Sequence, residues 1–180
     1  QYHKLLAESH IVGNPKFDDW FSGTLDKQTI EELSGRLDPG KKTILYLPTH
    51  SGLSSLHTFS DSVRKLSDRY NVVIKFHHLN PLTEKQIVDQ LREDPRLYIF
   101  DESEDILPLF AISDAVVSDS SSVAFEAVLI DKPLVLLDMT ADEVRFDEHS
   151  SGREFNGFWY SGGLTYRGSI DEIIKKRGQE

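Results

Sequence analysis

The segment Ser113–Glu126, SDAVVSDSSSVAFE, decides the fold class of this 180-residue chain. Its run AVV, at Ala115–Val117, is β-branched and has no polar alternation, which is typical of a parallel strand buried on both faces. An acid and three serines follow at Asp119–Ser122, where an apolar helix pattern begins. Serine and aspartate are preferred at helix starts because a side-chain oxygen accepts from a free N–H group of the first turn. The segment therefore predicts a strand–turn–helix unit.

The same unit recurs along the chain. Further strands are expected at Thr43–Leu47, Asn71–Phe76, Leu97–Phe100 and Pro133–Leu137. Helical patterns separate them, at Leu56–Arg69, Thr83–Arg92, Ile106–Ile112 and Ser122–Ile130. Alternation at this spacing predicts an α/β fold with a Rossmann-like, doubly wound parallel sheet. The length is that of one domain, so we expect residues 1–180 to form one.

Composition limits the class of ligand. The chain has 30 acidic residues against 20 Lys and Arg, and this net charge of -10 argues against a nucleic-acid partner and a polybasic membrane patch. A phosphate is still allowed, because a helix N-terminus attracts an anion locally. The absence of cysteine excludes disulfides and thiolate metal sites. Hydrolase-elbow, Walker, zinc-protease and dinucleotide motifs are absent, and we expect no metal and no cofactor.

Ligands of parallel α/β sheets bind beyond the carboxyl ends of the strands. This rule selects the loops Pro48–Gly52, His77–Asn80, Asp101–Glu104, Ser118–Ser122 and Asp138–Thr140. In the first of these loops, Thr49 and His50 either touch a phosphate or only form a turn. Both interpretations stay open on the sequence alone.

The serine turn predicts a phosphate site. Ser121 and Ser122 have hydroxyl donors beside the free N–H groups of a helix start, where the dipole adds about half a positive charge. Asp119 lies in the same turn, and Glu126, one helical turn beyond Ser122, is suited to accept from ribose hydroxyls. The alternative is a plain helix cap followed by a solvated glutamate.

A histidine pair, His77 and His78, follows the second core strand. Adjacent strand residues point to opposite faces, so we expect at most one of the two to face the ligand. That histidine is suited to donate to a phosphate oxygen or to protonate a leaving group. The alternative is that the two histidines are ordinary polar residues of the surface without a role in binding. Metal chelation needs further ligands, and none stands at a suitable spacing.

Four segments together resemble a known family: IVGNPKFDD from Ile11, ILYLPTHSG from Ile44, VIKFHHLN from Val73, and the stretch from Asp105 to Asp138. They resemble the nucleotide-binding half of CDP-glycerol glycerophosphotransferases, which are teichoic-acid polymerases and primases with a GT-B fold. The family's T-D-Y-S-S-V turn matches Ser118–Val123, and its strand-end histidine matches His77. Its P-T-W-R loop matches Pro48–Ser51, where His50 and Ser51 stand in place of W-R.

A second resemblance gives a different histidine. HLNP at His78–Pro81, with the serine turn and Glu126, is similar to UDP-N-acetylglucosamine 2-epimerases, another GT-B group. In that comparison His78, rather than His77, is the matching residue. Two departures from the first family also stand out, since Ser120 replaces its aromatic residue and Asn156 replaces the arginine of a later R-G-F-Y pattern.

The first resemblance implies one GT-B half, excised from a longer two-domain transferase whose N-terminal half is missing here. Such an enzyme transfers glycerol phosphate or a related unit from a CDP-linked donor to a polyol-phosphate or glycan acceptor. Ser121 and Ser122 would hold the donor phosphates and His77 would act on them. The implied location is cytoplasmic, with contact to the inner face of the cell membrane through the missing half. The alternatives are a nucleotide-sugar glycosyltransferase or epimerase, and a nucleotide-binding module without chemistry of its own.

Overall fold

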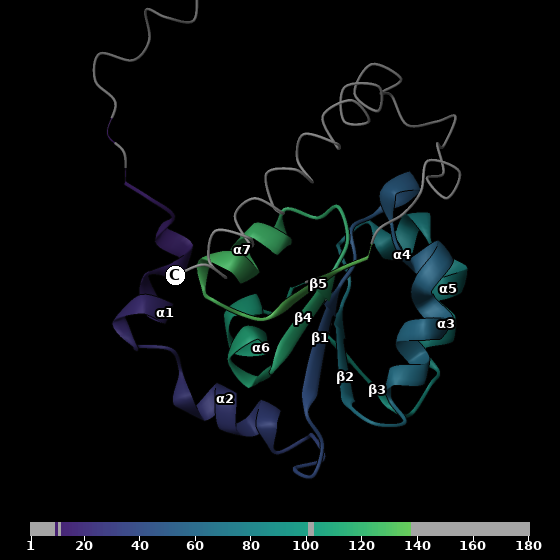
Figure 1. Ribbon diagram of the computed structural model, residues 1–180, viewed down its shortest axis with the longest axis horizontal. Coiled ribbons are helices and arrows are strands. Elements are labelled where there is room, and N and C mark those ends of the chain that lie inside the picture. Colours follow the sequence, from purple (N-terminus) through teal and green to yellow (C-terminus); the bar gives the residue numbers. More distant parts are fainter. Residues whose placement is uncertain (1–9, 11, 101–102, 138–180) are drawn as a thin grey trace, which may run out of the picture.

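The computed structural model describes residues 10, 12–100 and 103–137, and its centre is a parallel sheet of five strands in the order β3-β2-β1-β4-β5 (Figure 1). The strands are β1 (Thr43–Leu47), β2 (Asn71–Lys75), β3 (Leu97–Phe100), β4 (Ala115–Ser118) and β5 (Leu134–Leu136). The chain winds outward from β1 to one side through β2 and β3, then returns to the other side of β1 through β4 and β5. The predicted doubly wound parallel sheet is therefore confirmed, and its switch point lies between β1 and β4.

Helices cover both faces of the sheet. On one face lie α3 (Leu56–Leu66) and α5 (Lys85–Arg92), preceded by the short α4 (Asn80–Thr83) (Figure 1). On the other lie α6 (Ile106–Ile112) and α7 (Val123–Leu129), and α2 (Lys27–Ser34) packs against α6. The chain enters this layer through the 3-10 turn η2 (Pro15–Phe17) and α1 (Asp18–Ser22), and a second 3-10 turn, η3 (Ser51–Leu53), follows β1.

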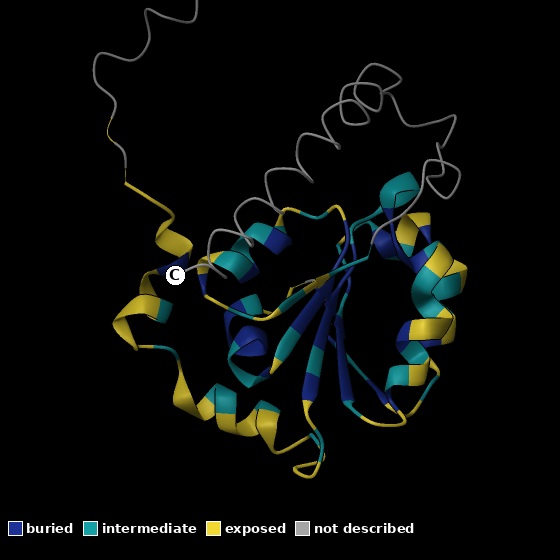
Figure 2. Cartoon of the chain, viewed as in Figure 1, coloured by how far each residue is buried: buried dark blue, intermediate teal, exposed yellow. Residues whose placement is uncertain are grey.

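The strands β1 to β4 each contribute to two hydrophobic cores, because alternate side chains point to opposite faces. In β1, Leu45 and Leu47 pack into the core beneath α6 and α7, whereas Tyr46 packs into the core beneath α3 and α5. All three are nearly inaccessible, and the sheet forms the buried centre between exposed helix surfaces (Figure 2). This double burial explains why the strands read as continuous apolar runs rather than as alternating ones.

One predicted helix differs from the structure. The pattern Thr83–Arg92 is divided into α4, which ends at Thr83, and α5, which begins at Lys85. Pro81 lies in the first turn of α4, where its missing N–H group is no loss, so helical structure starts before the proline rather than after it. Glu84, with φ -123 and ψ 34, separates the two helices.

The expected helix Leu56–Arg69 ends earlier, at Leu66, and the short helices α1 and α2 were not predicted. A left-handed glycine, Gly23 at φ 72, ends α1. The side chain of Asp26 accepts from the Gln28 N–H group and caps α2. Of the strand-end loops, Asp138–Thr140 and residues 101–102 lie outside the described residues, as does Asn156.

Candidate functional site

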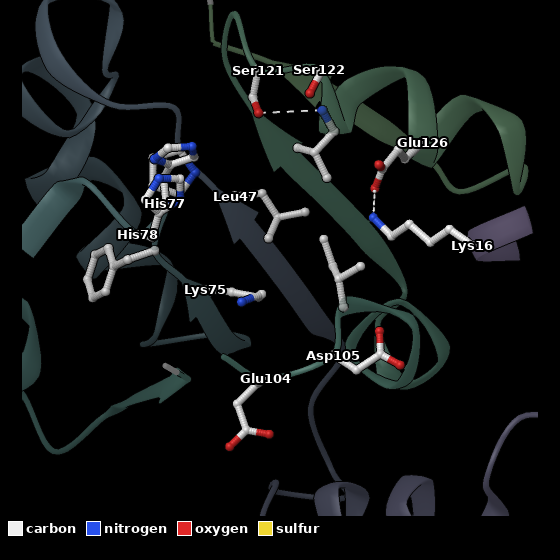
Figure 3. Close-up of a pocket in the computed structure, with 14 residues that line it drawn as sticks. Lys16, Leu47, Lys75, His77, His78, Glu104, Asp105, Ser121, Ser122 and Glu126 are labelled. Carbon is white, nitrogen blue, oxygen red and sulfur yellow. Dashed lines mark hydrogen bonds and ion pairs between the residues drawn. The ribbon is translucent and has the colours of Figure 1, made fainter. Parts of the chain in front are cut away.

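A pocket of about 370 Å³ opens at the carboxyl ends of β1, β2 and β4, beside the switch point (Figure 3). Its walls include Leu47 and Pro48 at the end of β1, the segment 76–78 after β2, and the segment 121–123 at the start of α7. With Glu104 after β3, four of the five loops selected from the sequence contribute to the pocket, brought together by the parallel register of the strands. The pocket has the place and size of a small-ligand site.

Ser121 and Ser122 both line this pocket. The Ser121 hydroxyl accepts from the N–H group of Val123 at 3.4 Å, so it also caps the first turn of α7. Ser122 is exposed and makes no capping hydrogen bond. The two interpretations of the serine turn are therefore compatible, since one serine caps the helix while both present hydroxyl groups to the pocket.

Three imidazole rings lie in a row beside the pocket, the first two stacked and the last two tilted against each other. The rings of His50 and His77 lie 4.3 Å apart at 22°, and those of His77 and His78 lie 4.1 Å apart at 33°. His77 and His78 both line the pocket, whereas at most one of them was expected to face it. The reason is that β2 ends at Lys75, so both histidines follow the strand and strand alternation no longer separates them.

The surroundings of His77 fix its tautomer. Its Nδ1 accepts from the Leu79 N–H group at 3.2 Å, so the ring proton of the neutral form lies on Nε2. Burial, followed by the neighbouring His50, His78 and Lys75, lowers the pKa of His77 from 6.5 to about 4. At neutral pH this side chain is thus an uncharged hydrogen-bond donor. Burial also lowers the pKa of His50.

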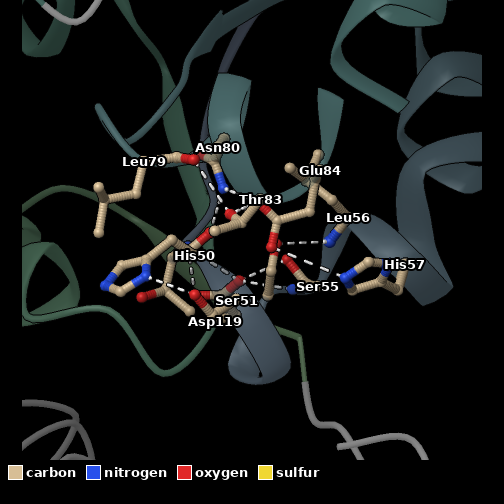
Figure 4. A network of polar contacts seen from close by, with 12 residues as sticks. His50, Ser51, Ser55, Leu56, His57, Leu79, Asn80, Thr83, Glu84 and Asp119 are labelled. Atoms are coloured by element: carbon tan, nitrogen blue, oxygen red, sulfur yellow. Dashed lines mark hydrogen bonds and ion pairs between the residues drawn. The ribbon is translucent and has the colours of Figure 1, made fainter. Parts of the chain in front are cut away.

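Asp119 lies behind the pocket rather than in its wall. Its carboxylate is buried, at 3% exposure, and accepts from the N–H groups of Thr49 and Ser55, each at 2.9 Å (Figure 4). The Ser55 hydroxyl also donates to it at 2.6 Å, and burial raises the pKa of Asp119. The carboxylate of Asp119 therefore ties the serine turn to the loop after β1.

A second buried group, Asn80, was not identified from the sequence. Its Oδ1 accepts from the His77 N–H group at 2.6 Å, and its Nδ2 donates to the Thr49 carbonyl at 2.8 Å. Nδ2 also donates to the buried carboxylate of Glu84 at 3.0 Å (Figure 4). Asn80 thus joins the histidine loop to the loop of Thr49. Its only signal in the sequence is an amide two residues after the histidine pair.

Replacing Asp119 by alanine is expected to lower the free energy of unfolding by about 2–4 kcal/mol, because the buried Ser55 N–H group and the partly buried Thr49 N–H group lose their acceptor. Urea denaturation followed by circular dichroism measures this change. The control is Asp61→Ala, which removes an exposed carboxylate from α3 and should change stability by less than about 0.5 kcal/mol. Equal effects of the two substitutions would refute the anchoring role.

Four further charged side chains line the pocket: Glu104, from a loop selected from the sequence, and Lys16, Lys75 and Asp105, which the sequence did not single out. Lys16 follows Pro15 in η2, and its Nζ contacts Glu126 Oε2 at 2.7 Å. Glu126, the predicted ribose ligand, therefore does line the pocket but has a cationic partner. Asp105 caps α6 by accepting from the Leu107 N–H group.

The described part of the chain, residues 10, 12–100 and 103–137, holds neither a metal-binding cluster nor a membrane-spanning helix. Among these residues no group of three or more His, Cys, Asp or Glu side chains is arranged to hold a metal ion. Within the same residues, no helix has both the length and the apolar character needed to cross a membrane.

Two curated proteins are similar to this chain. Teichoic acid poly(ribitol-phosphate) polymerase of Bacillus spizizenii is 29% identical over 111 residues, which are 57% of this chain and 17% of that protein. Teichoic acid glycerol-phosphate transferase of Staphylococcus aureus is 29% identical over 151 residues, which are 74% of this chain and 37% of that protein. The chain therefore spans well under half the length of either relative.

The fold is shared with a solved structure, that of the wall teichoic acid polymerase TagF. The TM-score is 0.53 at 19% identity, over 92% of this chain and 50% of the TagF chain. The sheet is thus the Rossmann-like sheet of one GT-B half. The model of the CDP-Glycerol:Poly(glycerophosphate) glycerophosphotransferase family matches residues 2–150. The chain belongs to this glycerophosphotransferase family of enzymes.

Proposed function

We propose that this chain is the donor-binding domain of a transferase that moves glycerol phosphate, or a related unit, from a CDP-linked alditol to a hydroxyl acceptor. The observation that carries the proposal is a pocket lined by Ser121 and Ser122 together with His77. Family membership and the similarity to teichoic acid polymerases support it. The related TagF crystals were soaked with CDPG, which is consistent with a CDP-linked donor.

In this proposal the diphosphate of the donor binds between the serine turn and the row of histidine rings. Ser121 and Ser122 donate hydrogen bonds to its oxygens, and hydrogen bonds to charged groups are among the stronger ones in proteins. His77 donates from Nε2, the position that its contact with Leu79 leaves protonated. A neutral donor of this kind stabilises developing negative charge without itself giving up a proton. The low pKa of His77, about 4, therefore favours charge stabilisation over acid catalysis.

The reaction needs one bond made and one broken. The acceptor hydroxyl attacks the phosphorus that carries glycerol, a new P–O bond forms, and the P–O bond to CMP breaks. CMP leaves with the electron pair and gains negative charge, which the serine hydroxyls and His77 stabilise. As in other phosphoryl transfers, positioning and charge stabilisation supply most of the catalysis. The proton of the acceptor hydroxyl goes to a base, which we assign to the half of the transferase that precedes this domain.

Asp119 and Thr49 have an indirect role in this scheme. Their hydrogen bond joins the serine turn to the loop after β1, and neither side chain lines the pocket. Asp119 holds Thr49 and Asn80 holds both Thr49 and His77, so the serine turn and the histidine are kept in register. His50 supports His77 by stacking behind it. We therefore propose Asp119, Thr49 and His50 as residues that position the donor ligands.

Product analysis on the longer protein that contains this domain tests the function. We expect CDP-glycerol with a glycerol-phosphate primer to give CMP and an extended product, and UDP-N-acetylglucosamine to give no epimer and no sugar transfer. The isolated chain should bind CDP and release no CMP above a buffer control. Turnover of the UDP-sugar alone would favour the nucleotide-sugar alternative. Tight nucleotide binding without turnover of either donor by the longer protein would favour a module without chemistry.

A further inference from the structure

We propose that Lys16 is a ligand of the donor phosphates and that Glu126 is its counter-ion when no donor is bound, so that an incoming diphosphate exchanges the two. The inference rests on the proposed function, since it requires an anionic ligand in the pocket. It gives Lys16 a role in selecting charged donors and gives Glu126 a role that changes during binding.

The position of Lys16 is fixed by its neighbour. Phe17 is 1% exposed and packs into the core beneath α6 and α7, together with the partly buried Trp20. This anchors the η2 turn against the domain and places Lys16 at the rim of the pocket, although 110 residues separate it from Glu126 (Figure 3). The lysine is thus held near the serine turn by packing, and the ion pair is not needed to bring it there.

The ion pair itself is suited to exchange. The Lys16 and Glu126 side chains are 41% and 23% exposed, and ion pairs in contact with water are weak. A diphosphate carries more negative charge than one carboxylate and presents more acceptor oxygens, so it competes well for a flexible ammonium group. Once Lys16 turns to the phosphates, the carboxylate of Glu126 is released to accept hydrogen bonds from ribose hydroxyls.

The charges of the pocket support this assignment. Within the described part of the chain, the cationic side chains that line the pocket are Lys16 and Lys75, while Glu104, Asp105 and Glu126 are acidic. His77 is neutral at neutral pH because its pKa is about 4. A diphosphate therefore needs the lysines to offset its charge, and Lys16 is available only if it leaves Glu126.

The exchange predicts opposite effects of two substitutions on the binding of inorganic diphosphate. Lys16→Met should weaken it by about tenfold or more, because a charged hydrogen bond is lost. Glu126→Gln should strengthen it by about threefold, because the lysine no longer has a competing carboxylate. A purely structural ion pair gives no such opposition. Calorimetry at low ionic strength measures both affinities, and Lys16→Arg, which keeps the charge, should stay within about threefold of the unchanged protein.

Two controls separate this inference from the function on which it rests. Lys27→Met removes an exposed lysine of α2 outside the pocket and should leave diphosphate binding unchanged. Cytidine has no phosphate to draw Lys16 away from Glu126, so Lys16→Met should not weaken the binding of cytidine. If the unchanged protein binds neither diphosphate nor CDP, both proposals fail. If it binds diphosphate and Lys16→Met binds it equally well, or Glu126→Gln binds it less well, the exchange alone is refuted.

Discussion

Replacing Ser121 and Ser122 together by alanine is expected to weaken CDP binding by about 10²–10⁴-fold while cytidine binding changes little. Each serine loses a hydrogen bond to a charged oxygen, which is worth about 1.5–3 kcal/mol. Cytidine has no phosphate, so it has no such contact to lose. Calorimetric titration of the double variant with both ligands measures the difference.

The control for the serine pair is Ser120→Ala, an exposed serine of the same turn that does not line the pocket. It should leave the affinity for CDP unchanged. The substitution of Ser121 also removes its hydrogen bond to the first turn of α7 and so lowers stability. Urea denaturation measures this loss of stability separately from ligand binding. Equal weakening of CDP and cytidine would mean that the serines act only as helix caps.

His77→Ala should lower the rate of group transfer by the longer protein by about 10²–10³-fold, the usual effect of removing one donor that stabilises developing charge. The fold should remain intact, because His77 is only half-buried and follows the strand rather than packing in it. His77→Gln should recover part of the rate, since its amide N–H group is also a neutral donor. His78→Ala should lower the rate of group transfer by a smaller factor. The reverse order of the two alanine variants would favour the epimerase-like alignment.

The same account predicts the behaviour of His77 with pH. Its pKa in the folded protein, about 4, lies below the ordinary value of 6.5. As the pH falls through this interval, the unfolded chain takes up a proton before the folded one does, so stability falls. The contribution is fully present above about pH 6.5 and is lost as the pH approaches 4. Titration of the His77 ring by NMR should therefore show no protonation between pH 6 and 8.

The sheet could be predicted from the sequence because its strands are continuous apolar runs. The runs Thr43–Leu47 and Leu97–Phe100 match β1 and β3 at both ends. Such runs, without polar alternation, fit only strands that are buried on both faces. The division of the helix near Thr83 could not be predicted, since it depends on the buried Glu84, whose partner Asn80 becomes apparent only in three dimensions.

The candidate site could be predicted in part for a similar physical reason. Parallel strands bring their carboxyl ends to one edge, so the sequence was sufficient to gather Ser121, Ser122 and His77. The sequence does not predict in which direction a side chain at that edge points. Asp119 accepts hydrogen bonds from the N–H groups of Thr49 and Ser55 and does not line the pocket. Lys16 reaches the pocket through the core packing of Phe17, which no local pattern encodes.

A crystal structure of this chain with CDP tests the central claim most directly. The account predicts that the diphosphate lies in the pocket at the ends of β1, β2 and β4, within hydrogen-bond distance of the hydroxyls of Ser121 and Ser122 and of Nε2 of His77. CDP bound elsewhere, or bound here with its diphosphate pointing away from the serine turn, would contradict the account.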